Sequence, residues 1–218
     1  MSDARGAARE EAILRAVLDL VAEVGYDQVT MDAIAARARA SKATIYRRWP
    51  GKAEMVVAAV RGRAGAAAVT PPDTGELRTD LLAVLRQMRD GLLAQDAALV
   101  LGLMVAMHRD PALADAVRAR FVQDKHAMFG AAIAQAVARG DLPAGLDAAL
   151  FMEISSSMLF SRLFVAGEPL DDAFVLRLVD DVLLPLLDHQ TSATHQTSAT
   201  HQTSATDRTS ATHRTSAT

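Results

Sequence analysis

The side chains best suited to chemistry lie together in one short segment, residues 30–52. From residue 37 to residue 52 the chain has six basic residues and no acidic one. Hydroxyl groups lie among them, on Thr30, Ser41, Thr44 and Tyr46. Cationic and hydroxyl groups donate hydrogen bonds to phosphate oxygens, and Lys or Arg also binds guanine edges. The segment therefore predicts a site for double-stranded DNA.

The elements that must position these side chains are short helices. Thr30 can cap one helix, and Ser41 can cap the next, which we expect over residues 42–48. Pro50 and Gly51 break the chain before a further helix from Lys52. A short helix behind a turn is how a helix-turn-helix enters the major groove, with the N-terminal residues of the helix toward the base edges. A solvated charged surface is the simpler alternative.

Residues 9–60 resemble the DNA-binding domain of the TetR family, through Gly25-Tyr26, Thr30 and the sequence SKATIYRRWPGK. The resemblance implies phosphate contacts from Thr30, Thr44, Tyr46 and Lys52, and base reading near Lys42, Ala43 and Arg47. It also implies that Ile45 points into the core, whereas Trp49 either packs at the helix end or touches DNA. The predicted DNA-binding residues are Thr30, Ser41, Lys42, Ala43, Thr44, Tyr46, Arg47, Arg48 and Lys52.

The turn before the recognition helix departs from the family pattern. The family often has Gly where this chain has Arg39, and Val where it has Ala40. A residue other than Gly with a positive φ is uncommon. We therefore expect a turn that is strained or differently shaped.

Composition predicts an all-α fold, because Ala and Leu dominate and aromatic residues are only 4% of the chain. We expect about nine helices, in an N-terminal three-helix helix-turn-helix domain and a larger C-terminal ligand-binding and dimerisation domain. The predicted parts are the DNA-binding domain over 7–62, a linker over 63–75, the effector-binding and dimerisation domain over 76–187, and a tail over 188–218. The tail holds five hexapeptide repeats with no apolar residue larger than Ala, so we expect disorder.

The larger domain resembles the family's effector-binding domain in the number and order of its helices. We expect a long helix from Asp110-Pro111 to Gly140, then helices over 147–165 and 171–187. By analogy the last two helices pair with their copies in a homodimer; the alternative is that their apolar stripe packs within one subunit. That stripe consists of Leu170, Phe174, Leu178, Val182 and Leu186.

Methionines between the helices of this domain suggest a pocket for a largely apolar small molecule, because methionine adapts to varied ligands. Most of these residues would equally serve as plain core. The candidate pocket residues are Met88, Met104, Met107, His108, Met128 and Met152.

Other functions lack their signatures. There is no cysteine, no Gly-rich phosphate loop, and no glycine elbow at the serines 155–157, so we expect no enzyme, cofactor or metal site.

The longest uncharged apolar run, residues 97–107, is shorter than the ~20 residues of a membrane helix, so we expect a cytoplasmic protein. The expected function is a ligand-responsive repressor that releases a palindromic operator. A regulator controlled by a protein partner, or an activator, remains the alternative.

Overall fold

The computed structural model describes residues 2–63, 73–119 and 123–190, and within these ranges the regular structure is helical. The helices are α1 (Ser2–Val24), α2 (Met31–Arg37), α3 (Lys42–Tyr46), α4 (Lys52–Arg63), α5 (Leu77–Leu93), α6 (Ala97–Arg109), α7 (Pro111–Val117), α8 (Gln123–Arg139), α9 (Ala148–Phe160) and α10 (Asp172–Arg177). The π-helical segments η3 (Ser161–Ala166) and η4 (Leu178–Leu183) continue α9 and α10. The all-α prediction is confirmed.

The described helices number ten, one more than we expected. The predicted long helix from Pro111 to Gly140 is instead two helices, α7 and α8. The last helix continues past Pro185 to residue 190, into the first hexapeptide repeat. Proline lacks an N–H and crowds the preceding turn, and here the wider turns of η4 come directly before it. The predicted linker over 64–72 and the tail from residue 191 lie outside the described residues.

Local sequence sets where most helices begin. A cap side chain accepts a hydrogen bond from a backbone N–H at the start of six helices, which satisfies a donor that the first turn leaves unpaired. These caps are Thr30, Ser41, Asp96, Asp110, Asp147 and Asp171. Gly25, with φ 78°, ends α1 as its position in the sequence predicts.

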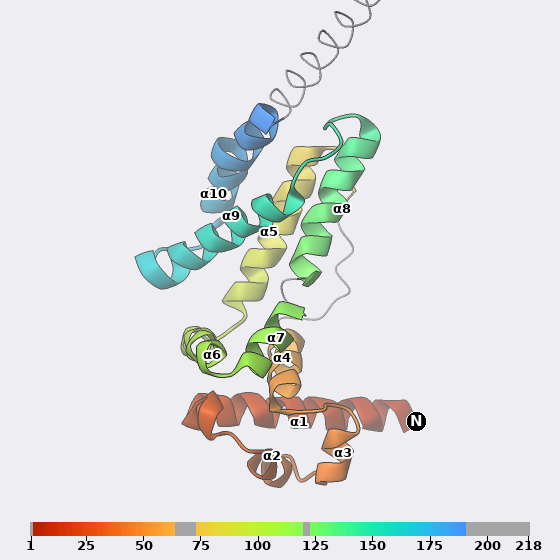
Figure 1. Cartoon of the computed structure of the whole chain (residues 1–218), viewed down its shortest axis with the longest axis vertical. Coiled ribbons are helices and arrows are strands. Elements are labelled where there is room, and N and C mark those ends of the chain that lie inside the picture. The colour runs from red at the N-terminus through yellow and green to blue at the C-terminus, as the bar shows by residue number, and fades with distance from the viewer. Residues whose placement is uncertain (1, 64–72, 120–122, 191–218) are drawn as a thin grey trace, which may run out of the picture.

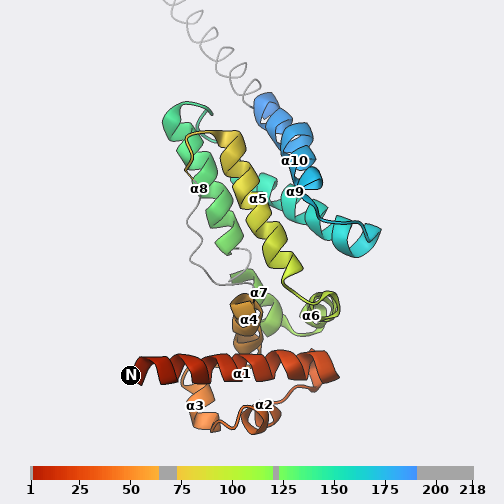
Figure 2. The ribbon, with the colours of Figure 1, turned by 180° about the vertical axis from the view of Figure 1, so that it is seen from behind.

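The helices form two bodies stacked along the long axis of the molecule (Figure 1). At one end α1 lies across the molecule, with α2 and α3 on its outer side and α4 rising from it toward the other end (Figure 2). Beyond α4 lie α6 and α7, followed by the long helices α5 and α8, with α9 and α10 beside them. The recognition helix α3 thus lies at the end of the molecule farthest from α10.

Each body has its own hydrophobic core. The first, here called the head cluster, joins α1–α4 to Leu99 and Ala106 of α6 and Leu113 of α7. The second, the upper cluster, is built from α5, α8, α9 and α10 with its η4 continuation. Helices α6 and α7, which the sequence assigns to the larger domain, therefore pack with the DNA-binding helices.

The apolar stripe of the last helix is largely core. Leu170, Phe174 and Leu178 are buried in the upper cluster, at 5%, 8% and 1% exposure. Val182 and Leu186 are partly buried against the same cluster. Packing within one subunit, the alternative left open above, therefore holds for most of the stripe, because the last helix turns this side toward α5.

Helix α9 with η3 is long and apolar over residues Ala148–Ala166, with a mean hydropathy of 1.4. By length and composition this stretch could cross a membrane, and α5 with α6 passes the same test as a pair bent by 92°. Glu153 and Arg162 interrupt this stretch, so it contains no long uncharged run. Only 22% of this stretch is buried inside the subunit, so an apolar helix faces outward.

Candidate DNA-binding interface

The recognition helix α3 is held by its caps and by one buried anchor. Ser41 Oγ accepts a hydrogen bond from Thr44 N at 3.2 Å and lies 2.8 Å from the Thr44 hydroxyl. Thr30 Oγ1 accepts from Ala33 N at 3.2 Å at the start of α2. Ile45 is fully buried and fixes α3 to the head cluster, as the resemblance implies.

The turn between α2 and α3 contains the one non-glycine residue with a positive φ in the described chain, Arg39 at 49°. The expectation of an unusual turn is therefore confirmed. Ala40 is buried at 9% and its N–H donates to Ala35 O at 3.0 Å, which holds the turn in place. The Arg39 side chain is exposed.

Most of the predicted DNA-binding side chains face solvent on α3 and its flanks. Thr44 and Lys52 are half-buried. Trp49 is 6% exposed and packs in the head cluster, which supports a structural role. The exposed members are Thr30, Ser41, Lys42, Ala43, Tyr46, Arg47 and Arg48.

The cations of this surface fall into two groups. Lys42 Nζ lies 2.5 Å from Asp32 Oδ1, and the hydrogen bond to this carboxylate raises the pKa of Lys42, so the ammonium stays charged. Arg48 forms an ion pair with Glu10. By contrast, the guanidinium groups of Arg39 and Arg47 have no partner among the residues that the structure describes. Unpaired cations on an exposed helix suit a polyanionic partner.

Lys52 has partners inside the protein. Its Nζ donates to Tyr26 O at 3.0 Å and lies 4.1 Å from the centroid of the Tyr26 ring. The Tyr26 hydroxyl in turn donates to Asp110 Oδ2 at 2.7 Å. We call Tyr26, Lys52 and Asp110 the head joint, because they tie α4 and the short 3-10 helix Tyr26–Gln28 to the start of α7. The phosphate contact that the resemblance implies for Lys52 stays a prediction.

The head joint is electrostatically consistent. Burial, and then the hydrogen bond to Asp110, raise the pKa of Tyr26 well above its ordinary value of 10.0, so the hydroxyl keeps its proton. The same hydrogen bond lowers the pKa of Asp110, whose other oxygen accepts from Ala112 N and Leu113 N at the start of α7. Because 84 residues separate Tyr26 from Asp110, no spacing in the sequence could have revealed this contact.

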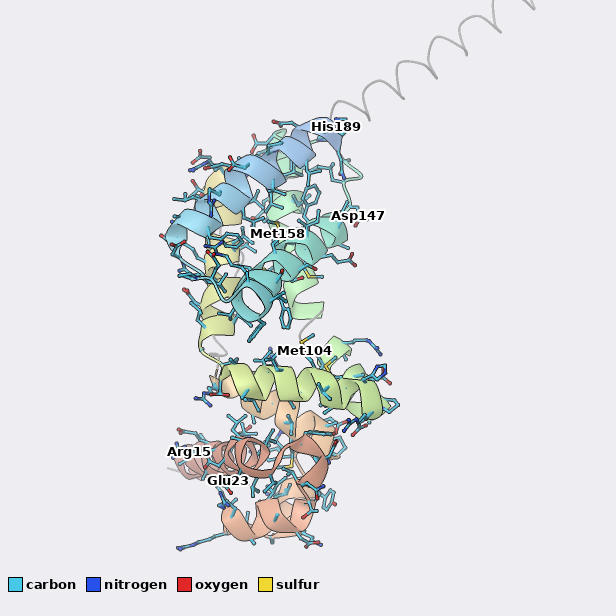
Figure 3. The ribbon with its side chains drawn as sticks, turned by 90° about the vertical axis from the view of Figure 1, so that its left-hand side faces the viewer. Arg15, Glu23, Met104, Asp147, Met158 and His189 are labelled. Carbon is cyan, nitrogen blue, oxygen red and sulfur yellow. The ribbon has the colours of Figure 1, made fainter. Side chains whose placement is uncertain are left out.

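The predicted pocket residues do not come together in one place. Met88, Met128 and Met152 are buried in the upper cluster. Met107 is partly buried against the head cluster, whereas Met104 and His108 are exposed on α6. Figure 3 shows Met104 on the side of α6 that faces α9.

The serines of α9 have a structural use. Ser155 Oγ donates to Phe151 O at 2.7 Å and Ser156 Oγ donates to Met152 O at 2.8 Å. Ser155 is fully buried, so its hydroxyl is paired with backbone and not with a general base.

Two family models match the chain. Residues 13–59 match the bacterial regulatory proteins, tetR family, and residues 71–182 match the Tetracyclin repressor-like, C-terminal domain. The boundary between the two matches lies before α5, although the structure packs α6 and α7 with the first four helices.

Similar proteins cover nearly the whole described chain. A DNA-binding transcriptional repressor TetR of Mycobacteroides abscessus is 42% identical over 184 residues, covering 84% of this chain and 96% of that protein. An HTH-type transcriptional regulator of Mycobacterium tuberculosis is 40% identical over 183 residues, covering 84% of this chain and 90% of its own. The solved structure of the TetR family transcription regulator SCO0332 superposes with a TM-score of 0.56 at 29% identity, covering 78% of this chain and 94% of that one. The chain therefore belongs to the TetR family and is a DNA-binding transcriptional regulator, not an enzyme.

Proposed function

We propose that this regulator is a repressor that binds a palindromic operator as a homodimer and releases it when a small molecule binds the C-terminal domain. The observation that carries the proposal is the exposed surface of α3, where unpaired Arg39 and Arg47 flank the positions that would read bases. Repression is supported by the mycobacterial relative, whose name describes a repressor. Such a protein would work in the cytoplasm, beside the chromosome.

Selection of bound fragments from genomic DNA, at a stated salt concentration, tests operator binding. We expect enrichment of a palindrome, because a two-fold dimer reads two half-sites about one helical turn apart. Arg47→Ala should weaken binding to the enriched duplex more than to a scrambled duplex of equal length. Arg15→Ala, an exposed residue of α1 paired with Glu11, serves as the control. If no sequence is enriched, operator reading by the isolated protein is ruled out.

The outward-facing apolar stretch of α9 and η3 supports the homodimer. Leu150 and Val165 are 38% and 77% exposed, and small serines lie between them at positions 157 and 161 on the same side. A second copy of this helix would cover the exposed Leu150 and Val165, together with the exposed Glu153 one turn before Ser157. This helix, rather than the stripe on the last helix, is therefore the face that we assign to the dimer.

A charge in the middle of this face should separate the subunits. We expect Ser161→Arg to convert a dimer into a monomer in analytical ultracentrifugation, because a desolvated guanidinium without a partner opposes association. Gln87→Arg, on an exposed position of α5, is the matched control and should leave the dimer intact. A dimeric Ser161→Arg protein would contradict the assignment.

Helix α6 supports a largely apolar effector. Leu101, Met104 and Val105 are 43%, 48% and 56% exposed, and they gather on one side of the helix. Met104 faces toward α9 (Figure 3), and the exposed His108 lies one turn further along. An apolar molecule against this side would cover the exposed side chains, and His108 could donate to its polar end.

The packing supplies a route from effector to DNA. Helices α6 and α7 pack with α1 and α4, and the head joint ties them to the turn that precedes α2. A ligand that moves α6 would therefore carry the DNA-binding helices with it. A coupling of only ~1–3 kcal/mol, typical of allosteric proteins, would change operator occupancy measurably.

A further inference from the structure

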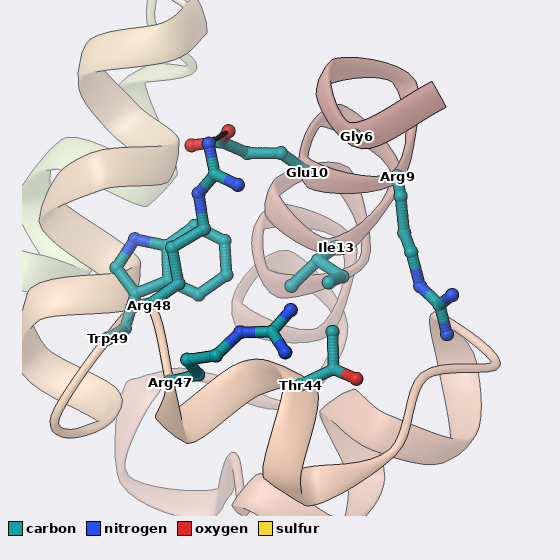
Figure 4. A pocket seen from close by; sticks show the side chains of 8 residues that line it. All are labelled: Gly6, Arg9, Glu10, Ile13, Thr44, Arg47, Arg48 and Trp49. Atoms are coloured by element: carbon teal, nitrogen blue, oxygen red, sulfur yellow. Dashed lines mark ion pairs between the residues drawn. The ribbon is translucent and has the colours of Figure 1, made fainter. Parts of the chain in front are cut away.

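A cavity of about 280 Å³ lies in the DNA-binding part of the chain, beside the predicted DNA-binding surface, with which it shares Thr44, Arg47 and Arg48. It opens between the first turns of α1 and the end of α3 (Figure 4). The lining residues are Gly6, Arg9, Glu10, Ile13, Thr44, Arg47, Arg48 and Trp49.

The walls of this cleft differ in character. Ile13 and Trp49 form an apolar floor, at 2% and 6% exposure. Three guanidinium groups and one carboxylate line the rest, so the cleft carries an excess of two positive charges. One of these cations is already neutralised, because Arg48 pairs with Glu10 and thereby joins α1 to the end of α3.

The two remaining arginines, Arg9 and Arg47, are free. Neither has a hydrogen-bond or ion-pair partner in the described ranges, and both are exposed. In Figure 4 Arg9 descends from α1 toward the level of α3, and Arg47 extends from the end of α3 toward α1. Thr44 lies on α3 next to Arg47 (Figure 4), and its hydroxyl is 2.8 Å from the Ser41 hydroxyl.

We propose that this cleft binds a phosphate group of the operator backbone, with Arg9 and Arg47 as its cationic donors and the Thr44 hydroxyl as a third. The assignment rests on the proposed function, because the cleft shares Thr44 and Arg47 with the surface of α3. It adds Arg9, and with it the start of α1, to the DNA contacts. The operator footprint would then extend past the bases that α3 reads, to the backbone beside α1.

The salt dependence of binding tests this contact. Each phosphate that a protein neutralises contributes about 0.9 to the slope of log K against log salt concentration. In a two-fold dimer Arg9→Ala removes one cation from each of two phosphates while Arg47 still faces both, so we expect the slope to fall by at most about 1.8, with equal weakening on the selected and the scrambled duplex. Arg9→Lys should keep most of the slope, because it keeps the charge.

Arg15→Ala is the matched control, since it removes an exposed arginine from another side of the same helix. If the wild-type protein selects no DNA sequence, the proposed function fails and the cleft assignment fails with it. If the wild-type protein binds its selected duplex and the slope of Arg9→Ala equals that of Arg15→Ala, only the cleft assignment is wrong.

The cleft could instead bind a free phosphate ion. Trp49 fluorescence distinguishes a free phosphate ion from a phosphate of the DNA backbone. Trp49 is the only tryptophan in the chain and lines the cleft, so its fluorescence reports occupancy. We expect the duplex to change the Trp49 emission, and millimolar inorganic phosphate at constant ionic strength to leave it unchanged. Saturation by inorganic phosphate in the wild type but not in Arg9→Ala, with an unchanged salt slope, would overturn the assignment in favour of a small-anion site.

Discussion

The head cluster and the upper cluster hold their helices together by different means. The head cluster is almost purely apolar inside, and its polar contacts to α7 lie at the edge, in the head joint. The upper cluster encloses a fully buried carboxylate, Asp80, and ion pairs join its helices from outside, such as Arg78 with Asp180 between α5 and η4. The polar contacts of the head joint therefore lie at the edge of the head cluster, whereas the upper body contains a carboxylate that water cannot reach.

The two clusters also show where the cores of the molecule divide. Helices α6 and α7 belong to the C-terminal domain by sequence but share a core with the DNA-binding helices. The boundary between the two clusters thus lies between α6 and the upper helices, on the side where α6 exposes its apolar residues. A ligand bound there would act at the boundary and not inside either core.

The largest change in the free energy of unfolding should follow from truncating the side chain that anchors α7 in the head cluster. Leu113 is fully buried in the head cluster, so Leu113→Ala should lower the free energy of unfolding in urea by about 2–5 kcal/mol. Hydrogen exchange should show lost protection in α4 and α7 but not in α5 and α8. Leu178→Ala, equally buried in the upper cluster, should show the reverse pattern. The same pattern for both variants would mean that the two clusters unfold as one.

A smaller loss should follow from changing the buried carboxylate of the upper cluster. Asp80 Oδ1 accepts from Thr74 N and Thr74 Oγ1, each at 2.8 Å, and Oδ2 accepts from Arg139 at 3.3 Å. Asp80→Asn replaces one acceptor by a donor that faces Arg139 or Thr74, and should lower the free energy of unfolding by about 1–3 kcal/mol.

Asp73→Asn is the control for Asp80→Asn. Asp73 pairs with the same Arg139 at 3.0 Å but is largely exposed, so the change should be much smaller. Neither variant should change the affinity for the selected duplex, since both lie in the upper body. Weakened DNA binding by Asp80→Asn alone would show that the two bodies are coupled without a ligand.

The smallest effect on stability should come from the head joint. Tyr26→Phe removes the hydrogen bond to Asp110 and should lower the free energy of unfolding by about 1 kcal/mol near neutral pH, because water can reach the half-exposed Asp110. It should change the response of operator binding to the effector more than the binding itself. An unchanged effector response would remove the head joint from the route proposed above.

The pH dependence sharpens this test. The pKa of Tyr26 is raised in the folded protein, so its contribution to stability is present below pH 10 and is lost as the pH rises above that value. The difference in unfolding free energy between the wild type and Tyr26→Phe should therefore shrink above pH 10. A difference that stays constant through pH 11 would mean that Tyr26 is not held in a buried hydrogen bond.

Sequence alone determined the features that depend on neighbours along the chain. The caps Thr30 and Ser41, the end of α1 at Gly25, and the inward Ile45 were predictable because each needs only the residues within one or two helical turns. The density of the SKATIYRRWPGK segment made the family evident as well. The positive φ of Arg39 was predictable from a missing glycine.

Tertiary structure decided which surface each amphipathic helix buries. A stripe such as Leu170, Phe174 and Leu178 is apolar whether it meets its own subunit or a second one, so periodicity could not assign it. The same ambiguity applied to the methionines, which the fold divides between two cores and the surface. The head joint and the cleft between Arg9 and Arg47 join residues that only folding brings within reach. Capping hydrogen bonds depend only on residues a few positions apart in the sequence. Packing partners depend on how the whole chain is folded, because residues far apart in the sequence must come into contact.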